Sequence, residues 1–261
     1  MAFDSGYDSF DPITDYIGVC LLAAQYYNRN CDEWDEVKEL AMKFFLDSAM
    51  VDEIEYALDA WDIDGVTTNP RHVQVSGKPF LQAVKEIGRL MEGTEKTVSV
   101  EVNPHIMDTD EMVAEAEKLA ALCPNFVIKL QCVEPAFKAV RMLAERDIRC
   151  NVTLIFSAAQ ALQAMRSGAY YVSPFIGWKE SNAEEVQGFI RDIVAIRDNF
   201  NFETEVLVAA VRNGRQIADA AVFGADIVTA GSAVYKAAFE HPYTDFGIDK
   251  FISFWDQTPY E

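Results

Sequence analysis

The sequence predicts an α/β fold, a single (β/α)8 TIM barrel with a helical N-terminal extension and a C-terminal helix. From residue 43 onward, eight short β-rich runs alternate with amphipathic stretches. Strand followed by helix, repeated eight times, is typical of this barrel. In addition, no Pro-, Gly- or Ser-rich linker divides this part of the chain. We therefore expect one catalytic domain over residues 43–261.

The eight predicted strands are short, and several are continuously apolar. Such runs suit strands that are buried on both faces of a parallel sheet. They are KFFLD (43–47), DGVTT (64–68), TVSVE (97–101), FVIKL (126–130), RCNVTL (149–154), AYYVS (169–173), EVLVAA (205–210) and DIVTA (226–230). The main alternative is a doubly wound open sheet, which is weakened because no GxGxxG turn follows any of these runs.

Amphipathic patterns fill the intervals between the strands. In residues 51–61, Ile54, Ala57, Leu58 and Trp61 fall along one side of a helix. Comparable patterns in other intervals predict the layer of helices that covers the outside of the barrel.

Residues 1–42 precede the first strand and form the predicted helical extension. Asp11 followed by Pro12 is typical of a helix start, with an N-cap and then proline at the first helical position. The extension either covers the barrel base or an interface, or serves as a lid. At the other end, residues 245–257 carry apolar side chains at helical spacing. They predict a helix that packs on the barrel or on a neighbouring subunit.

Composition argues against several classes of protein. The 42 acidic residues outnumber the 22 basic ones, which gives a formal charge of -20. This balance argues against nucleic acid and against an anionic membrane surface as partners. No apolar run approaches the ~18 residues of a membrane span, and the N-terminus lacks the early basic residues of a secretory signal.

Cysteine and histidine usage gives no sign of a metal site. The five cysteines form no CxxC pair, so we expect neither a disulfide framework nor zinc, and a reducing cytoplasm fits best. His72, His105 and His241 lie far apart in the sequence and show no HExxH-like spacing.

Polar residues lie at or near the ends of several predicted strands, where a barrel places its reactive groups. They are Asp47, Thr67, Asn69, Glu101, Lys129, Asn151, Thr153 and Ser173. Side chains alternate along a strand, so Val127 and Lys129 share one face of the run 126–130. The other face is wholly apolar and would meet the helices. Lys129 is therefore expected to point into the barrel.

A lysine in that position suggests a specific chemistry. Apolar surroundings favour the neutral form of an amine, and a neutral amine can attack a carbonyl to form a Schiff base. A lysine beside two carboxylates, here Asp47 and Glu101, is what a class I aldolase mechanism requires. The alternative is that Lys129 neutralises one of them structurally or merely caps a strand. Thr67 and Thr153 are equally compatible with strand packing, and Asn69, which precedes Pro70, is also compatible with a simple turn.

Six motifs together resemble one known family. They are GVTTNP (65–70), VSVEV (98–102), FVIKL (126–130), CNVTLIFSAAQAL (150–162), SPFIG (173–177) and HPYTDFGIDKF (241–251). Over residues 43–258 the sequence resembles the transaldolase family, in particular its short members, which are similar to fructose-6-phosphate aldolase. The first 42 residues lie outside the resemblance.

The resemblance implies roles for the polar residues. Lys129 would be the Schiff-base lysine, and Asp47 would move protons at the C3–C4 bond. Glu101, with Thr153 and a bound water, would handle proton transfers during carbinolamine formation and dehydration. Other side chains would hold the hydroxyls of the bound three-carbon unit, namely Asn69, Asn151 and Ser173, supported by Thr67. The iminium would be the electron sink, so no metal or organic cofactor is expected.

Two positions resemble the transferring branch of the family. Glu101 and Phe175 match the transfer enzymes, whereas simple aldolases have Gln and Tyr there. A tyrosine hydroxyl near the Schiff base can help to place a water that hydrolyses the adduct, and Phe175 offers no such hydroxyl. We therefore expect transfer of dihydroxyacetone to an aldehyde.

The chain departs from the family pattern where the substrate's anionic terminus is held. Trp178, followed by Lys179, replaces an arginine after the SPF motif, and Ala210 replaces a serine, while Arg212 is retained. Arg71 and Lys179 are candidate replacement cations. The terminus is then either a phosphate held differently or a sulfonate, as in the sulfofructose transaldolases that resemble this family.

The expected function is thus a class I transaldolase. It would move dihydroxyacetone from a ketose with a phosphate or sulfonate terminus to an aldehyde such as glyceraldehyde 3-phosphate. One alternative is an enzyme of the fructose-6-phosphate aldolase type that releases dihydroxyacetone, and another is a non-catalytic barrel that binds a sugar acid. Short members of the family tend to form pentamers or decamers, so a homo-oligomer is expected.

Overall fold

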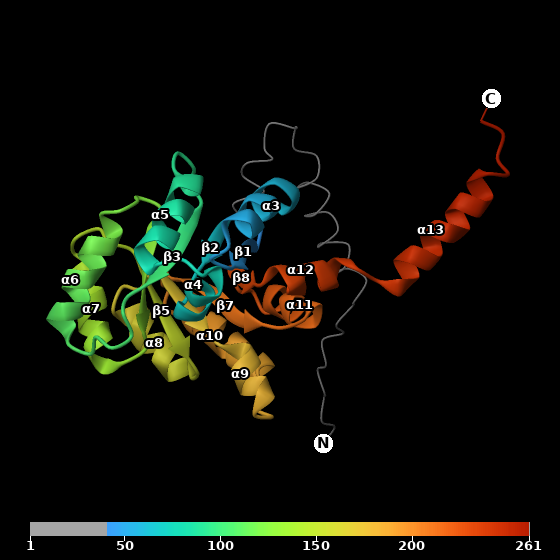
Figure 1. The fold of residues 1–261 in the computed structure, drawn as a ribbon. Coiled ribbons are helices and arrows are strands. Elements are labelled where there is room, and N and C mark those ends of the chain that lie inside the picture. Colours follow the sequence, from blue (N-terminus) through green and yellow to red (C-terminus); the bar gives the residue numbers. More distant parts are fainter. Residues whose placement is uncertain (1–40, 261) are drawn as a thin grey trace, which may run out of the picture. The chain divides into compact units, whose positions relative to one another are not determined.

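The computed structural model describes residues 41–260, so the predicted N-terminal extension lies almost entirely outside the described residues. Eight parallel strands close into a barrel in chain order, with β8 (Ile227–Ala230) paired to β1 (Lys43–Asp47) (Figure 1). This closed sheet, with a helical segment between each pair of consecutive strands, confirms the predicted (β/α)8 barrel.

Each predicted strand overlaps an observed one, and the differences are confined to one or two residues at the ends. The remaining strands are β2 (Gly65–Thr67), β3 (Thr97–Glu101), β4 (Phe126–Gln131), β5 (Cys150–Ile155), β6 (Tyr171–Pro174) and β7 (Glu205–Val211). The register pairs Glu101 with Lys129, and Lys129 with Asn151. Residues paired in this way face the same side of a sheet, so the three side chains converge.

Helices follow the strands and surround the barrel (Figure 1). They are α3 (Val51–Trp61), α4 (Pro70–Ser76), α5 (Phe80–Met91), α6 (Thr109–Ala120), α7 (Glu134–Ala144), α8 (Ala158–Arg166), α9 (Ile176–Ser181), α10 (Gln187–Asn199), α11 (Gly214–Val222) and α12 (Ser232–Phe239). The last helix, α13 (Pro242–Trp255), follows α12 and extends away from the barrel (Figure 1). The short helices α4 and α9 are additions to the basic repeat, and no more than two residues separate either of them from the end of the preceding strand.

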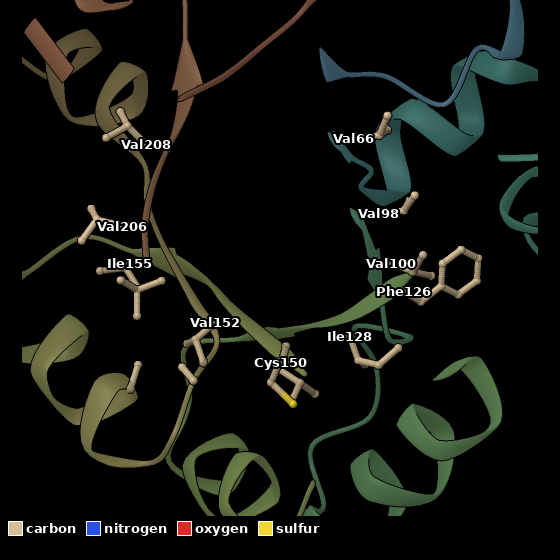
Figure 2. Close-up of a cluster of buried hydrophobic side chains, with 14 of the residues drawn as sticks. Val66, Val98, Val100, Phe126, Ile128, Cys150, Val152, Ile155, Val206 and Val208 are labelled. Carbon is tan, nitrogen blue, oxygen red and sulfur yellow. The ribbon is translucent and has the colours of Figure 1, made fainter. Parts of the chain in front are cut away.

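The main hydrophobic core lies between the sheet and the helices. Figure 2 shows Ile128, Cys150 and Val152 projecting from their strands toward the surrounding helices. A helix supplies the matching apolar stripe: α5 buries Ala83, Val84, Ile87, Gly88 and Met91 along one side. The observed alternation of β4 confirms that its outer face is apolar.

A second, smaller cluster fills the interior of the barrel. It contains Phe45, Val127, Tyr171, Leu207, Ala209 and Ile227. The rings of Phe45 and Tyr171 meet edge to face with centroids 6.0 Å apart, and the Tyr171 hydroxyl bonds to that of Thr97 at 3.1 Å. Val127 belongs to this cluster and precedes Lys129 on the same face of β4, so Lys129 lies nearer the carboxyl end of the barrel.

The predicted C-terminal helix is present as α13, but none of its residues is buried. Its exposed side chains include Phe246, Phe251, Phe254 and Trp255. The barrel of the same chain therefore does not cover the apolar face of this helix. Within residues 41–260, no helix has both the length and the apolar character needed to cross a bilayer.

Candidate active site

A cavity of about 380 Å³ lies at the carboxyl ends of the strands. Eleven of the predicted site residues line it: Asp47, Thr67, Asn69, Arg71, Glu101, Lys129, Thr153, Ser173, Phe175, Trp178 and Arg212. The other two, Asn151 and Lys179, do not. Residues from distant parts of the sequence thus meet in one place, as the barrel topology predicts.

Lys129 is the most enclosed charged group of the cavity, with a side chain only 4% exposed. Its Nζ donates a hydrogen bond to the backbone carbonyl of Thr68 at 3.1 Å and lies 3.8 Å from Oε2 of Glu101. The barrel register produces this approach, because Glu101 and Lys129 are paired on adjacent strands. The amine is thus held beside a carboxylate within the cavity.

Asp47 ends β1, and two side chains hold its carboxylate. Thr67 donates its hydroxyl to Oδ1 at 2.8 Å, and Nε2 of His72 lies 3.0 Å from Oδ2. Burial raises the pKa of Asp47. The hydrogen bond and charge of His72, the charge of Lys129 and the hydrogen bond of Thr67 together outweigh burial, so the pKa lies below its usual value.

Glu101 experiences the opposite balance. Burial raises its pKa, the charge of Lys129 lowers it, and the nearby charge of Asp47 raises it, with a net result above the usual value. Two carboxylates in one cavity therefore have pKa values displaced in opposite directions. Such a pair suits a base that stays ionised and a second group that gains and loses protons more readily.

Asn151 lies behind the cavity wall and is fully buried. Its Oδ1 accepts a hydrogen bond from the hydroxyl of Ser173 at 2.7 Å, and its Nδ2 donates to the hydroxyl of Ser99 at 2.9 Å. Asn151 thus orients Ser173, which does line the cavity. Asn151 therefore does not reach the cavity itself and would act on a ligand only through Ser173.

The hydroxyl of Thr153 is the exception among these polar groups. Its Oγ1 is buried and has no hydrogen-bond partner in the described part of the chain. Because buried polar atoms are normally paired, and because Thr153 lines the cavity, this atom is available to a group that enters it. The neighbouring Leu154 has a φ of 59°, at an irregularity in the pairing of β5 with β6.

The mouth of the cavity carries two arginines and an indole. Arg212 donates a hydrogen bond from Nη1 to the hydroxyl of Ser181 at 2.6 Å. The half-exposed ring of Trp178 stacks on Phe156 and meets Phe175 edge to face, with centroids 6.0 and 5.6 Å away. Arg71 lines the same cavity. The mouth therefore combines positive charge with an aromatic wall.

Lys179 does not contribute to this mouth. Its Nζ donates to the carbonyl of Phe156 at 3.2 Å and to the carboxylate of Glu184 at 2.5 Å, and it lies over the ring of Phe189. These contacts engage the ammonium group of Lys179 and connect α9 to the neighbouring residues. Of the two candidate replacement cations, Arg71 lines the cavity and Lys179 does not.

The end of β7 is held in an uncommon backbone conformation. Ala210 has a φ of 58°, in the left-handed region that is uncommon for residues other than glycine. A Cβ on Gly177 would lie 2.1 Å from the carbonyl oxygen of Ala210, so only glycine allows α9 to approach β7 this closely. This contact fixes Trp178 and Arg212 relative to each other. Strained conformations of this kind concentrate at functional sites.

His72 is a site residue that no pattern in the sequence singles out, because its wide separation from the other histidines argues only against a metal site. The available signal was the pair Asn69 and Pro70, which is typical of a helix start. Asn69 does cap α4, accepting a hydrogen bond from the backbone N–H of His72 at 3.0 Å. A helix that starts so soon after β2 brings its first turn to the carboxyl end of the barrel.

Comparison with known proteins agrees with this geometry. Residues 44–257 match the family described as Transaldolase/Fructose-6-phosphate aldolase. A 6-deoxy-6-sulfo-D-fructose transaldolase from Priestia aryabhattai is 52% identical over 218 residues, which are 83% of this chain and 96% of the relative. A probable transaldolase from Hydrogenobaculum sp. (strain Y04AAS1) is 44% identical, over 84% of this chain and 98% of the relative.

Solved structures agree on the fold alone. Thiamine phosphate pyrophosphorylase from Pyrococcus furiosus has a TM-score of 0.54 and 14% identity, covering 77% of this chain and 94% of that one. For 3-hexulose-6-phosphate synthase from Salmonella typhimurium the values are 0.54 and 18%, covering 76% and 92%. The sequence match, by contrast, spans the whole barrel and every strand that contributes to the cavity. The chain belongs to the transaldolase/fructose-6-phosphate aldolase family, and it is an enzyme of the transaldolase type.

Proposed function

We propose that this transaldolase moves a dihydroxyacetone unit through a Schiff base on Lys129. The donor is a ketose with a sulfonate terminus, 6-deoxy-6-sulfofructose, and the acceptor is an aldehyde such as glyceraldehyde 3-phosphate. The observation that carries the proposal is the enclosed amine of Lys129, 3.8 Å from the Glu101 carboxylate and in the same cavity as Asp47. These are the groups that imine formation and carbon–carbon cleavage need.

In the first half of the reaction, Lys129 attacks the C2 carbonyl of the ketose. The attacking amine must lose a proton, and the carbinolamine oxygen must gain one before it leaves as water. Glu101 is suited to both transfers, because its raised pKa allows it to take up and return a proton. The unpaired hydroxyl of Thr153 supports this step by holding the water through which the proton passes.

In the second half, the iminium draws electrons from the C3–C4 bond. Asp47, kept ionised by its partners, accepts the proton of the C4 hydroxyl, the bond breaks, and an aldehyde leaves. The electron pair of the broken bond remains on the three-carbon unit as an enamine. This enamine then adds to the acceptor aldehyde, and Asp47 returns its proton to the new hydroxyl. Water then hydrolyses the product iminium by the reverse of the first half, which releases the new ketose and frees Lys129.

Other polar side chains hold the three-carbon unit in one geometry. Ser173, oriented by Asn151, offers its hydroxyl on the cavity wall. The side-chain oxygen of Asn69 already accepts from the backbone of His72, so its N–H groups are the ones that face substrate hydroxyls. Thr67 supports the site indirectly by fixing Asp47.

The aromatic wall favours transfer over release of free dihydroxyacetone. Phe175 lines the cavity and packs against Phe156 and Trp178, so this side of the site presents ring carbon and no hydroxyl. A wall of that kind offers no hydroxyl to place a water that protonates the enamine carbon, the step that must come before dihydroxyacetone can be released. The enamine therefore persists until an acceptor aldehyde arrives.

The sulfonate terminus is supported by the composition of the cavity mouth. Arg71 and Arg212 are the two guanidinium groups among the described residues that line the cavity, while Lys179 is engaged elsewhere. A sulfonate carries one negative charge and needs fewer cations than a phosphate dianion. The relative with 52% identity is named for a sulfonated ketose, whereas relatives at 39–44% are named only as probable transaldolases.

A donor panel tests the proposed terminus. With glyceraldehyde 3-phosphate as common acceptor, kcat/KM is measured for 6-deoxy-6-sulfofructose, fructose 6-phosphate and sedoheptulose 7-phosphate. We expect the sulfonate donor to be preferred by about tenfold or more, which corresponds to about 1.4 kcal/mol. Equal or higher values for a phosphate donor would contradict the sulfonate assignment while leaving the transaldolase chemistry intact.

We also propose that the protein works in the cytoplasm as a homo-oligomer, a pentamer or a decamer. Cys123, Cys132 and Cys150 are free thiols, in keeping with a reducing compartment. The exposed apolar side chains of α13 support self-association, because an uncovered apolar surface of this kind marks an interaction site.

A further inference from the structure

His72 contacts the reacting carboxylate from the first turn of α4. Its Nε2 lies 3.0 Å from Oδ2 of Asp47, and the side chains of the two residues are 25% and 23% exposed. The other carboxylate oxygen is bound by Thr67. Because each oxygen of Asp47 has its own partner, the carboxylate is restrained in both position and rotation.

We propose that His72 is a positioning residue for the transaldolase reaction. It donates a hydrogen bond from Nε2 to Asp47 and so holds that carboxylate in the cavity, free of a proton, until the substrate hydroxyl gives one up. This inference rests on the role proposed above for Asp47. It adds a group that comes neither from the strand ends nor from the expected anion contacts.

The backbone fixes His72 firmly enough for this task. Asn69 caps α4 by accepting the N–H of His72, and Pro70 occupies the first helical position with its φ already restricted. Thr67, at the end of β2, lies only a few residues earlier. One short segment, residues 67–72, therefore supplies the partners of both carboxylate oxygens.

The groups around Asp47 determine how strongly the contact with His72 affects the pKa of its carboxyl group. Lys129 from β4, Glu101 from β3, Arg71 from α4 itself and Arg212 after β7 line the same cavity. Burial pushes the pKa of Asp47 upward, and the hydrogen bond and charge of His72 are the largest opposing influences, followed by Lys129 and Thr67. Without His72, burial is opposed by fewer groups, so the pKa of Asp47 must rise.

Tyr235 is a further titratable group near this carboxylate. It packs from α12, and its hydroxyl donates to the backbone carbonyls of Phe45 and Val228. Burial raises the pKa of the Tyr235 hydroxyl, with the charges of Asp64 and Asp47 acting in the same direction. Tyr235 therefore stays neutral across the working pH range and does not compete with His72 for the role.

Loss of His72 is expected to shift the pH dependence of activity to higher pH. Cleavage needs Asp47 without a proton, so activity falls as the pH drops through the pKa of Asp47. Removing His72 raises that pKa, and the acidic limb of the activity profile moves to higher pH.

The cleavage step balances without another reactant. The proton of the C4 hydroxyl passes to Asp47, and the electron pair of the C3–C4 bond passes into the enamine on Lys129. His72 donates its hydrogen bond throughout and transfers no proton.

Two substitutions test the proposal. His72→Leu removes the donor, and His72→Gln keeps an N–H donor on a side chain of similar reach. We expect His72→Leu to lower kcat roughly 10- to 100-fold, as for loss of a hydrogen bond to a charged group, with less change in KM. Its acidic limb should move to higher pH. His72→Gln should recover part of both changes. The exposed His105, which does not line the cavity, supplies the matched control His105→Ala.

A second readout separates this inference from the proposed function. Dihydroxyacetone forms an iminium with Lys129 without any C3–C4 cleavage, so borohydride should trap the adduct equally well in wild type and His72→Leu. Wild-type kcat and an unshifted pH profile in His72→Leu would overturn the positioning role. Absence of the trapped adduct in the wild type would instead overturn the Schiff-base function itself. If His72→Leu fails to fold, His72→Gln decides. This variant keeps an N–H donor for Asp47, so the proposed role predicts that it retains part of the activity. A full loss of kcat with an unshifted pH profile in His72→Gln would overturn the role.

Discussion

Inside the cavity, one amine faces two carboxylates that differ in their surroundings. Asp47 has two hydrogen-bonding partners and a lowered pKa, whereas Glu101 is dominated by burial and has a raised pKa. The difference assigns them separate tasks in the proposed reaction. A single carboxylate would have to be both the ionised base of cleavage and the proton carrier of imine formation.

Lys129→Met tests the residue on which the chemistry depends. The substitution replaces a buried amine with an apolar side chain of similar length. Glu101 loses its ion-pair partner but can take up a proton in compensation, because its pKa is already raised, so the barrel should remain folded. We expect transfer activity to fall below detection while the circular dichroism spectrum and Tm stay near wild type. Substantial residual turnover would count against a Schiff base at this position.

Phe175→Tyr tests the apolar wall of the cavity. The added hydroxyl would stand near the iminium and could orient a water for hydrolysis. We expect the variant to release dihydroxyacetone from the donor ketose over many turnovers without an acceptor, whereas wild type should not. Phe156→Tyr, on a neighbouring ring outside the cavity lining, is the control. Sustained release by the wild type alone would show that the protein is an aldolase and not a transferase.

Most of the residues that line the cavity could be predicted from the sequence, because they follow the regular pattern of the strands. Strand alternation and strand ends decide which side chains reach the cavity, and both are visible as patterns around Asp47, Glu101 and Lys129. Spacing does not reveal the side-chain directions that pair Asn151 with Ser173 and Lys179 with Glu184, so these contacts could not be predicted. His72 was missed because its role arises from a helix start.

At the scale of elements, the strand ends and the two short helices build different parts of the site. The strands supply the reacting groups, and the added helices α4 and α9 bring Arg71, His72 and Trp178 to the mouth. Periodicity predicted the eight strands well, since parallel strands in a barrel are buried on both faces. It did not predict α4 and α9 as separate elements, because helices of one or two turns have no measurable amphipathic period.

Substitutions at the mouth test the anion site. Arg71→Met and Arg212→Met each remove one guanidinium but keep a long side chain. We expect each to raise KM for an anionic ketose about tenfold or more, as for a charge-assisted hydrogen bond, with little effect on the weak turnover of neutral fructose. Lys179→Met, which removes a cation outside the cavity, is the matched control. An effect of Lys179→Met as large as that of the arginine variants would contradict this assignment.

At the scale of the whole molecule, two features extend beyond the barrel itself. The protein carries a formal charge of -20, so an anionic donor must be attracted locally by the cations of the mouth. The second feature is α13, which the sequence predicted as a helix but whose packing partner it could not decide. Packing on the barrel of the same chain is excluded by the absence of buried residues on α13.

The exposed face of α13 predicts self-association. Phe251→Ser and Trp255→Ser together would remove two of its large apolar side chains, which are 73% and 64% exposed. We expect multi-angle light scattering to show a homo-oligomer for wild type and smaller species for the double variant. Identical mass distributions for the two proteins would show that α13 does not hold the assembly together.

The central claim is that the amine of Lys129 bonds covalently to the ketose during turnover. The most direct measurement is borohydride reduction of the protein mixed with 6-deoxy-6-sulfofructose, followed by peptide mass mapping, with Lys129→Met and Lys179→Met treated in parallel. We predict a reduced three-carbon adduct on the peptide containing Lys129, retained in Lys179→Met and lost in Lys129→Met. An adduct on another lysine, or none under conditions of active turnover, would contradict the account.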